Sequence, residues 1–304
     1  MTVPMRPPEP PEDVGRRIVV GVADSAAGHA AVTWAVDRAG STGAAITLLH
    51  VEEPAERGRA VLPRLRLVSG RDLLARELRF VRSIAPAVPV TTSRLQGSVM
   101  WALGAASAEA EMVVVGTHKS GFIHGTVYGS TSLQLAATAR CPVSVVPAAS
   151  VGVATGIVLG ADGSPAGRAA LRFAAAEADR SCTDLLIVRV LEVRDDDADD
   201  ASSRADATRL LKEFQEAARA AAPDLVLNAR VIHGTVAQAL VTMSIGARML
   251  VLGDARTDAG RNSLALGAVC HDALLNIQTP TVIVHGGDLD REGDPTEHAA
   301  AQIR

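Results

Sequence analysis

The chain contains the same strand-and-turn pattern twice, about 140 residues apart. Residues 17–25 read RIVVGVADS and residues 156–164 read GIVLGADGS, so that Gly21 matches Gly160. Two further pairs of segments repeat in the same order: MVVVG at 112–116 with MLVLG at 249–253, and CPVSVV at 141–146 with TPTVIV at 279–284. A tandem duplication on this scale predicts two domains that share one fold.

Short runs of Val, Ile and Leu alternate with alanine-rich stretches of helical period in each copy. This alternation predicts an α/β fold: two tandem doubly wound domains, each a five-stranded parallel sheet of order 3-2-1-4-5 with helices on both faces. Trp34 and Phe173 match in the first helix of each copy and are expected to pack in the core. The strands are expected at 17–22, 45–51, 88–94, 111–115 and 143–147, and at 156–161, 184–190, 225–232, 248–252 and 281–285.

The 304 residues are 48% hydrophobic, which is enough for two cores of ordinary size. The long polar stretches 53–68 and 191–205 are expected to be loops, and a short small-residue segment near 148–155 joins the copies. The expected division is therefore a disordered leader at 1–16, one domain at 17–148, a second at 155–287 and a flexible tail at 288–304.

Charge and cysteine usage narrow the class of protein. Binding to a phosphate backbone requires a basic face, and a chain with a formal net charge of −4 is not expected to have one. Nucleic acid is therefore not an expected partner. The cysteines Cys141, Cys182 and Cys270 are isolated, which favours reduced thiols and a cytoplasmic protein. No run approaches the roughly 20 apolar residues of a membrane span, and the proline- and acid-rich start is unlike a secretory signal.

A doubly wound sheet forms a crevice where its winding order reverses, here between strands 1 and 4 of each copy. The loops at that position are 23–28 with 116–130, and 161–167 with 253–268. In the first copy, 116–131 reads GTHKSGFIHGTVYGST and leads from strand 4 into the last helix. Glycines allow close approach of the backbone, and a helix that starts after Gly129 offers N–H groups and hydroxyls to a phosphate.

At these residues the chain resembles the universal stress protein family, over nearly its whole length as two tandem domains. ATP-binding members carry Gly, two residues, Gly, nine residues, then Gly followed by Ser or Thr. That pattern maps onto Gly116, Lys119, Gly129 and Ser130, with Thr131 next. Lys119 replaces the second glycine of the pattern and adds a cation near the phosphates. The resemblance implies ATP or a related adenine nucleotide, with Mg²⁺, as the ligand.

The two copies depart from the family pattern at different places. The family's strand-1 Asp maps onto Ala23 in the first copy, where only the neighbouring Asp24 offers a substitute, and onto Asp162 in the second. The later loop of the second copy carries Arg256 for the second glycine and Ala268 where a hydroxyl is expected. The resemblance also implies that the strand-2 valines present backbone to an adenine ring, although ordinary core packing explains them equally well. The corresponding positions are Val51 and Val190, with Gly253 and Gly267 in the second loop.

Other motifs carry less chemistry. His118 and His124 lie near Lys119, yet no Cys or carboxylate stands at metal-ligand spacing, so they are interpreted as loop histidines. The acidic run at 195–200 lacks the Gly and the distal Glu of a calcium loop and is interpreted as a solvated loop. No catalytic triad is evident, and no enzyme activity is expected beyond slow hydrolysis.

The last strand of each copy is apolar and would be a pairing liability at an open sheet edge. Family resemblance implies that residues 143–147 pair with 281–285 within the chain. It also implies that two copies of the whole chain form a homodimer. Three functions remain open: a stress-response protein that signals through bound adenine nucleotide, a nucleotide-independent scaffold, and an enzyme with a similar crevice, such as an adenylating enzyme.

Overall fold

The computed structural model describes residues 16–53, 68–117, 130–149, 154–192, 201–254 and 266–286. The expected leader, apart from Arg16, and the whole of the expected tail lie outside these ranges. Most of the loop predicted at 53–68, and the acidic run at 195–200, also lie outside the described residues.

Each half alternates strands and helices as the sequence predicts, with strand ends within about two residues of expectation. The first half comprises β1 Arg17–Gly21, α1 Ala26–Thr42, β2 Ala45–Glu52, α2 Gly70–Ile84, β3 Val90–Gln96, α3 Val99–Ala106, β4 Met112–Thr117, α4 Ser130–Thr138 and β5 Val143–Pro147. The second half comprises β6 Ile157–Gly160, α5 Pro165–Arg180, β7 Leu185–Leu191, α6 Ala201–Ala221, β8 Leu227–His233, α7 Val236–Met243, β9 Met249–Asp254, α8 Ala268–Leu275 and β10 Thr281–His285.

The predicted loop at 191–205 is wrong at both of its ends. Leu191 is the last residue of β7, and α6 begins at Ala201. The first turns of α6 are exposed and polar, so their sequence resembles a loop; the helix is stabilised further along, where Leu211 and Phe214 are buried on its inner face.

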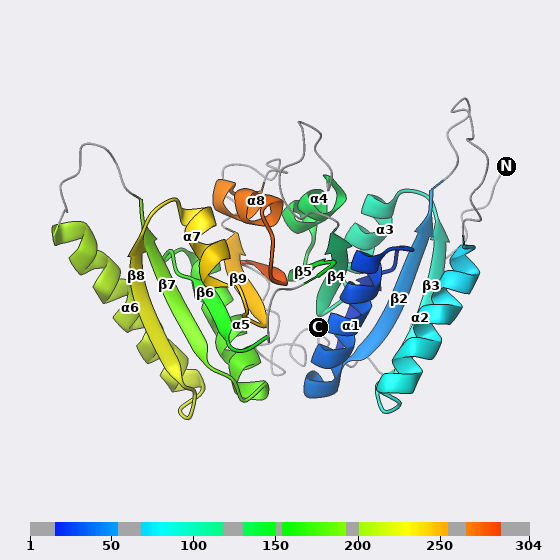
Figure 1. The fold of residues 1–304 in the computed structure, drawn as a ribbon, viewed down its shortest axis with the longest axis horizontal. Helices are drawn as coiled ribbons and strands as arrows, with labels where there is room; N and C mark the ends of the chain where they lie inside the picture. The colour runs from blue at the N-terminus through cyan, green and yellow to red at the C-terminus, as the bar shows by residue number, and fades with distance from the viewer. Residues whose placement is uncertain are drawn as a thin grey trace, which may run out of the picture.

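The two halves join into a single ten-stranded sheet of order β3-β2-β1-β4-β5-β10-β9-β6-β7-β8. Each half therefore has the predicted order 3-2-1-4-5, and the strands within a half are parallel. The predicted contact between the two edge strands is confirmed: β5 and β10 pair antiparallel, with Ser144 opposite Val282. Figure 1 shows the halves side by side with β5 between them. This pairing removes both of the apolar edges.

Helices cover both faces of the sheet, as predicted. Ile18 and Val20 of β1 are buried in a core layer formed with α1, α2, α5 and α6. Val19 faces the opposite layer, formed with α3, α4, α7 and α8. Successive strand residues are buried on alternate faces because the central strands are covered on both sides. Phe173 is buried and Trp34 is half-buried against the first layer, so both residues pack as predicted.

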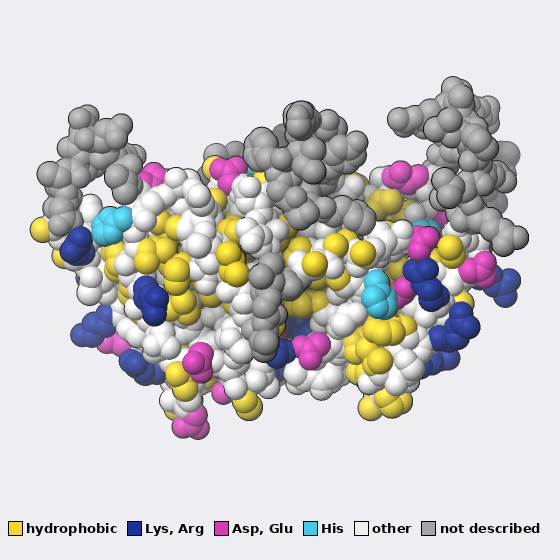
Figure 2. Space-filling model, in the orientation of Figure 1, with side chains coloured by type: hydrophobic (Ala, Val, Ile, Leu, Met, Phe, Trp, Pro, Cys, Tyr) yellow, Lys and Arg dark blue, Asp and Glu magenta, His cyan; other side chains and the backbone are white. Residues whose placement is uncertain are grey.

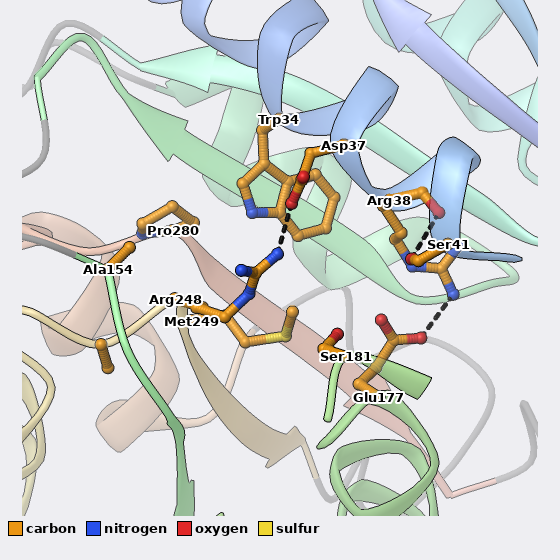
Figure 3. Close-up of a pocket in the computed structure, with 11 residues that line it drawn as sticks. Trp34, Asp37, Arg38, Ser41, Ala154, Glu177, Ser181, Arg248, Met249 and Pro280 are labelled. Atoms are coloured by element: carbon orange, nitrogen blue, oxygen red, sulfur yellow. Dashed lines mark hydrogen bonds and ion pairs between the residues drawn. The ribbon is translucent and has the colours of Figure 1, made fainter. Parts of the chain in front are cut away.

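A charged cluster lies between α1 and α5, where the halves meet. Arg38 and Glu177 occupy the same place in their helices relative to the N-cap serine, and their side chains pair across the junction at 2.9 Å. Both are almost fully buried, and Glu111 also contacts Arg38 at 2.7 Å. Figure 3 shows this pair and the ion pair of Asp37 with Arg248 beside a cavity of about 180 Å³. Opposite charges at equivalent positions favour pairing of unlike halves over pairing of like halves.

Charged side chains elsewhere are mixed in sign. On the face seen in Figure 2, Lys and Arg side chains stand among Asp and Glu side chains along the lower rim and the flanks. Within the described ranges, no helix is both long enough and apolar enough to cross a lipid bilayer.

Candidate functional site

The reversal of winding order on which the crevice prediction depends is present in each half. β1 neighbours β4, and β6 neighbours β9, so the chain reverses its winding order at these two places. After β1 the chain enters α1 on one face of the sheet, whereas after β4 it enters α4 on the other face. The helices that follow the two strands therefore lie on opposite faces of the sheet, which is the arrangement that forms a ligand crevice in doubly wound folds.

The second strand of each half extends past the end of the first. In the second half, the N–H of Ala161 donates to the carbonyl of Val188 at 2.8 Å, which is the last such bond between β7 and the chain that follows β6. Alternate residues of a strand direct their N–H and C=O groups to the same side. The N–H and C=O of Val190 thus face the crevice beyond Ala161. Val51 has the same place in the first half, because Val22 donates to the carbonyl of Leu49 at 2.8 Å.

A cavity of about 80 Å³ occupies the crevice of the second half. It brings together three residues that the sequence singles out, Asp162, Val190 and Gly253, and its other walls are mainly apolar. The remaining lining residues are Gly160, Ala161, Val188, Arg189, Val236, Leu240, Leu252, Val269 and Cys270.

Asp162 is held by its own turn at the start of α5. Its Oδ1 accepts hydrogen bonds from the backbone N–H of Ser164 at 3.0 Å and from the Ser164 hydroxyl at 2.8 Å. The Ser164 hydroxyl in turn caps α5 by accepting from the N–H of Gly167 at 2.9 Å. These contacts fix an exposed carboxylate at the mouth of the second crevice.

The first half differs at the equivalent turn. Ala23 follows β1, and the carboxylate of the next residue, Asp24, pairs with Arg76 of α2 at 3.0 Å. Arg76 also contacts the buried Glu77 at 3.0 Å, and the other carboxylate oxygen of Glu77 lies 2.9 Å from Nδ1 of His29. Asp24 is therefore engaged by a cation on α2, and a ligand in the first crevice would compete with that ion pair for its carboxylate.

Gly116 and Gly253 have a packing role that the sequence analysis did not assign. A Cβ atom on Gly116 would lie 2.2 Å from the carbonyl oxygen of Ala27, and one on Gly253 would lie 2.5 Å from the carbonyl carbon of Ala166. The absence of a side chain lets α1 and α5 approach the sheet closely at these points. The glycines are thus required by helix packing, and a role in ligand binding stays a prediction.

The strand end beside Gly253 carries a buried acid. Asp254 is 1% exposed, and its Oδ1 accepts from the N–H of Gly267, the N-cap residue of α8, at 2.8 Å. His285 of β10 lies opposite Asp254 in the sheet, with its Nδ1 3.7 Å from Oδ2. Burial, with smaller contributions from the charges of Asp254 and Asp162, raises the pKa of the Cys270 thiol. Sequence reasoning missed this cluster, which is absent from the first half.

The loops predicted to bind phosphate lie largely outside the described residues. Lys119, Gly129 and Arg256 lie outside the described residues. α4 begins at Ser130, as the expected helix start requires, and Thr131 is exposed in its first turn. Among the residues that the structure describes, no three His, Cys, Asp or Glu side chains form a group that could hold a metal ion.

The chain is similar to known proteins in sequence and in fold. A universal stress protein of Mycolicibacterium smegmatis is 30% identical over 287 residues, which cover 88% of this chain and 96% of that protein. A solved universal stress protein of Archaeoglobus fulgidus has a TM-score of 0.64 at 15% identity, and the match covers 89% of this chain and 98% of that one. A solved universal stress protein in complex with cAMP matches 44% of this chain and 98% of its own, at 24% identity and a TM-score of 0.36.

The family comparison reproduces the duplication. The model of the universal stress protein family matches twice, at residues 15–147 and 155–285, and these matches span most of the chain. The relative in Mycolicibacterium smegmatis has nearly the same length, so the match extends over both halves. The chain therefore belongs to the universal stress protein family and contains two of its domains in tandem.

Proposed function

We propose that this protein is a stress-response regulator that binds an adenine nucleotide at its strand-end crevices and signals through occupancy rather than catalysis. The observation that carries the proposal is the backbone of Val51 and Val190, whose N–H and C=O groups face the crevices beyond the last strand bonds. One N–H and one C=O on the same side match a ring nitrogen beside an amino group, as on the edge of adenine. The apolar walls of the second crevice suit the faces of such a ring.

The first half supplies the phosphate end in this proposal. The segment after Gly116 carries Lys119, Gly129 and Ser130, and α4 starts at Ser130 with Thr131 in its first turn. A helix start that follows a glycine offers N–H groups to an anion, and Lys119 adds a positive charge. ATP, with Mg²⁺ on its phosphates, is the nucleotide proposed for this crevice.

The carboxylates nearest the crevices already have structural partners. Asp24 pairs with Arg76, Asp162 accepts two bonds from Ser164, and Asp254 accepts from Gly267. These contacts support binding rather than turnover, because a general base must reach the proton that it removes.

A nucleotide-independent scaffold is the second candidate. The ten-stranded sheet and the buried Arg38–Glu177 pair fix the two halves in one arrangement, which supports a stable platform for a partner. The ion pair of Asp24 with Arg76 favours this candidate for the first half. A homodimer of the whole chain is proposed with either function, and light scattering of the purified protein would measure it.

Calorimetric titration of the full chain with Mg²⁺–ATP separates the two candidates. The nucleotide proposal predicts micromolar binding that is lost in a Gly129→Ala/Ser130→Ala variant. Thr138→Ala is the matched control, because it removes a hydroxyl at the far end of the same helix, where Thr138 bonds to the carbonyl of Gln134. Absence of both heat and thermal shift at millimolar ATP would contradict the nucleotide proposal and leave the scaffold.

A further inference from the structure

The second half holds a negative charge of its own at the place where a phosphate would approach. Asp254 ends β9, is buried, and accepts the N–H of Gly267 at the start of α8. A Cβ atom on Gly267 would lie 3.0 Å from the same carboxylate oxygen, so the carboxylate packs directly against the helix start. The positive end of the α8 dipole is therefore already paired with an anion from the chain.

His285 completes this arrangement from the neighbouring strand. It is 4% exposed and its Nδ1 lies 3.7 Å from Asp254, so an N–H group, an imidazole and a carboxylate meet in one buried cluster. The first half has Thr117 and Pro147 at the matching register positions, as β4 and β5 pair there. Neither residue carries a charge, so this cluster is a property of the second half.

A phosphate that reached the start of α8 would lose the N–H that Asp254 occupies and would meet a negative charge inside the protein. Like charges a few ångströms apart repel strongly where water is excluded. The opposite end of the crevice offers no such obstacle, because Val190, Val236 and Leu240 line a cavity there. Asp162 at the mouth offers carboxylate oxygens to hydroxyl donors such as those of a ribose.

We propose that Asp254 acts as an internal anion that fills the phosphate position of the second half, so that this crevice selects an uncharged adenine compound, such as adenosine, over phosphorylated nucleotides. This inference rests on the proposed function, since it assumes that the crevice accepts adenine. It makes Asp254 a specificity-determining residue and gives the two halves different ligands.

The test is calorimetry of the full chain with adenosine and, separately, with Mg²⁺–ATP. Asp254→Thr places the first-half residue in the second half, and Asp254→Asn keeps an acceptor for Gly267 while removing the charge. Val269→Trp identifies the site, because Val269 lines the cavity yet is 36% exposed, so a larger side chain fills the mouth without entering the core. Thermal melts of each variant report whether it is folded.

In the unmodified protein, we expect adenosine binding that Val269→Trp removes and ATP binding that Val269→Trp leaves unchanged. In Asp254→Thr, ATP gains affinity for the second crevice by at least about tenfold, which corresponds to about 1.4 kcal/mol, and Val269→Trp abolishes the gain. Asp254→Asn is expected to show a smaller gain in ATP affinity, and it provides the test if the threonine variant does not fold.

Two outcomes would overturn the inference in different ways. In the first, Val269→Trp weakens ATP binding as much as it weakens adenosine binding. This result would show that Asp254 does not exclude phosphate, and it would leave the proposed function intact. In the second, Val269→Trp leaves the affinity for adenosine unchanged, which would show that the second crevice does not bind adenine. If ATP also fails to bind anywhere on the chain, the proposed function fails with it.

Discussion

The two halves share their packing residues and differ in the residues that line their crevices. Gly116 and Gly253 admit α1 and α5 to the sheet in the same way, and an N-cap serine starts each of these helices. However, the first half has Thr117 at the end of β4, whereas the second half has the buried Asp254 at the end of β9. A duplicated fold thus keeps what its packing requires, while each strand-end crevice is free to acquire its own chemistry.

The halves also differ in charge where they meet, and this contact should carry the largest effect on stability. Arg38→Met leaves the buried Glu177 without its partner across the junction. Arg180 of α5 also contacts Glu177, so we expect a loss at the lower end of the range for a broken buried ion pair, about 3 kcal/mol in the free energy of unfolding. Urea denaturation measures it, and Asp37→Asn is the control, because Asp37 is 67% exposed and an exposed pair contributes less than about 1 kcal/mol.

The packing glycines should behave alike in both halves. Gly116→Ala and Gly253→Ala each force a Cβ atom against helix backbone, so each is expected to destabilise the protein by about 2 to 3 kcal/mol. Gly40→Ala is the control within α1, since a Cβ there has no atom within 4 Å; it should stabilise by about 0.5 to 1 kcal/mol. If Gly116→Ala leaves the melting temperature unchanged, the close approach of α1 to β4 is not real.

Cys270 should make stability fall with pH in the second half. Its folded-state pKa is raised above the unfolded value of about 8.5, so its contribution is fully present below that pH. Above it the unfolded thiol ionises and the folded one does not, so stability falls by about 1.4 kcal/mol per pH unit. Denaturation of the unmodified protein and of Cys270→Ala at pH 8 to 10 should show this difference in slope; equal slopes would refute the shifted pKa.

The helix caps should give the smallest effects. Ser25→Ala and Ser164→Ala each remove a side-chain bond to the first turn and should lose about 1 kcal/mol. Thr235 occupies the same position in α7 without a side-chain cap bond, so Thr235→Ala should change the stability by only a few tenths of a kcal/mol. Thermal melts rank the three variants, and a loss at Thr235 equal to that at Ser164 would show that the cap bond is not the cause.

The fold could be predicted because it depends on local patterns. Apolar runs, helical periods and the duplication give the strands and their order. The apolar edges predicted that β5 and β10 are covered, and the family resemblance predicted that they pair with each other. The start of α6 was missed because its first turns are polar and exposed. Where a strand or helix buries one periodic face, the period is visible in the sequence and the element can be predicted.

The crevices were less predictable because their contacts join residues that lie far apart in the chain. Asp24 offered a substitute for the missing strand-1 acid, yet Arg76 of α2 takes its carboxylate. The contact of Asp254 was not predicted, since its bond to Gly267 joins residues on either side of the segment between β9 and α8. A comparison of the last residues of β5 and β10, Pro147 with His285, was the available signal for that cluster.

The central claim is that the two crevices take different ligands, and native mass spectrometry of the full chain with ATP tests it most directly. The account predicts one ATP per chain in the unmodified protein and two in Asp254→Thr, since the first half supplies the only phosphate position until the internal carboxylate is removed. Two ATP molecules on the unmodified chain, or an Asp254→Thr chain that still binds one, would contradict it.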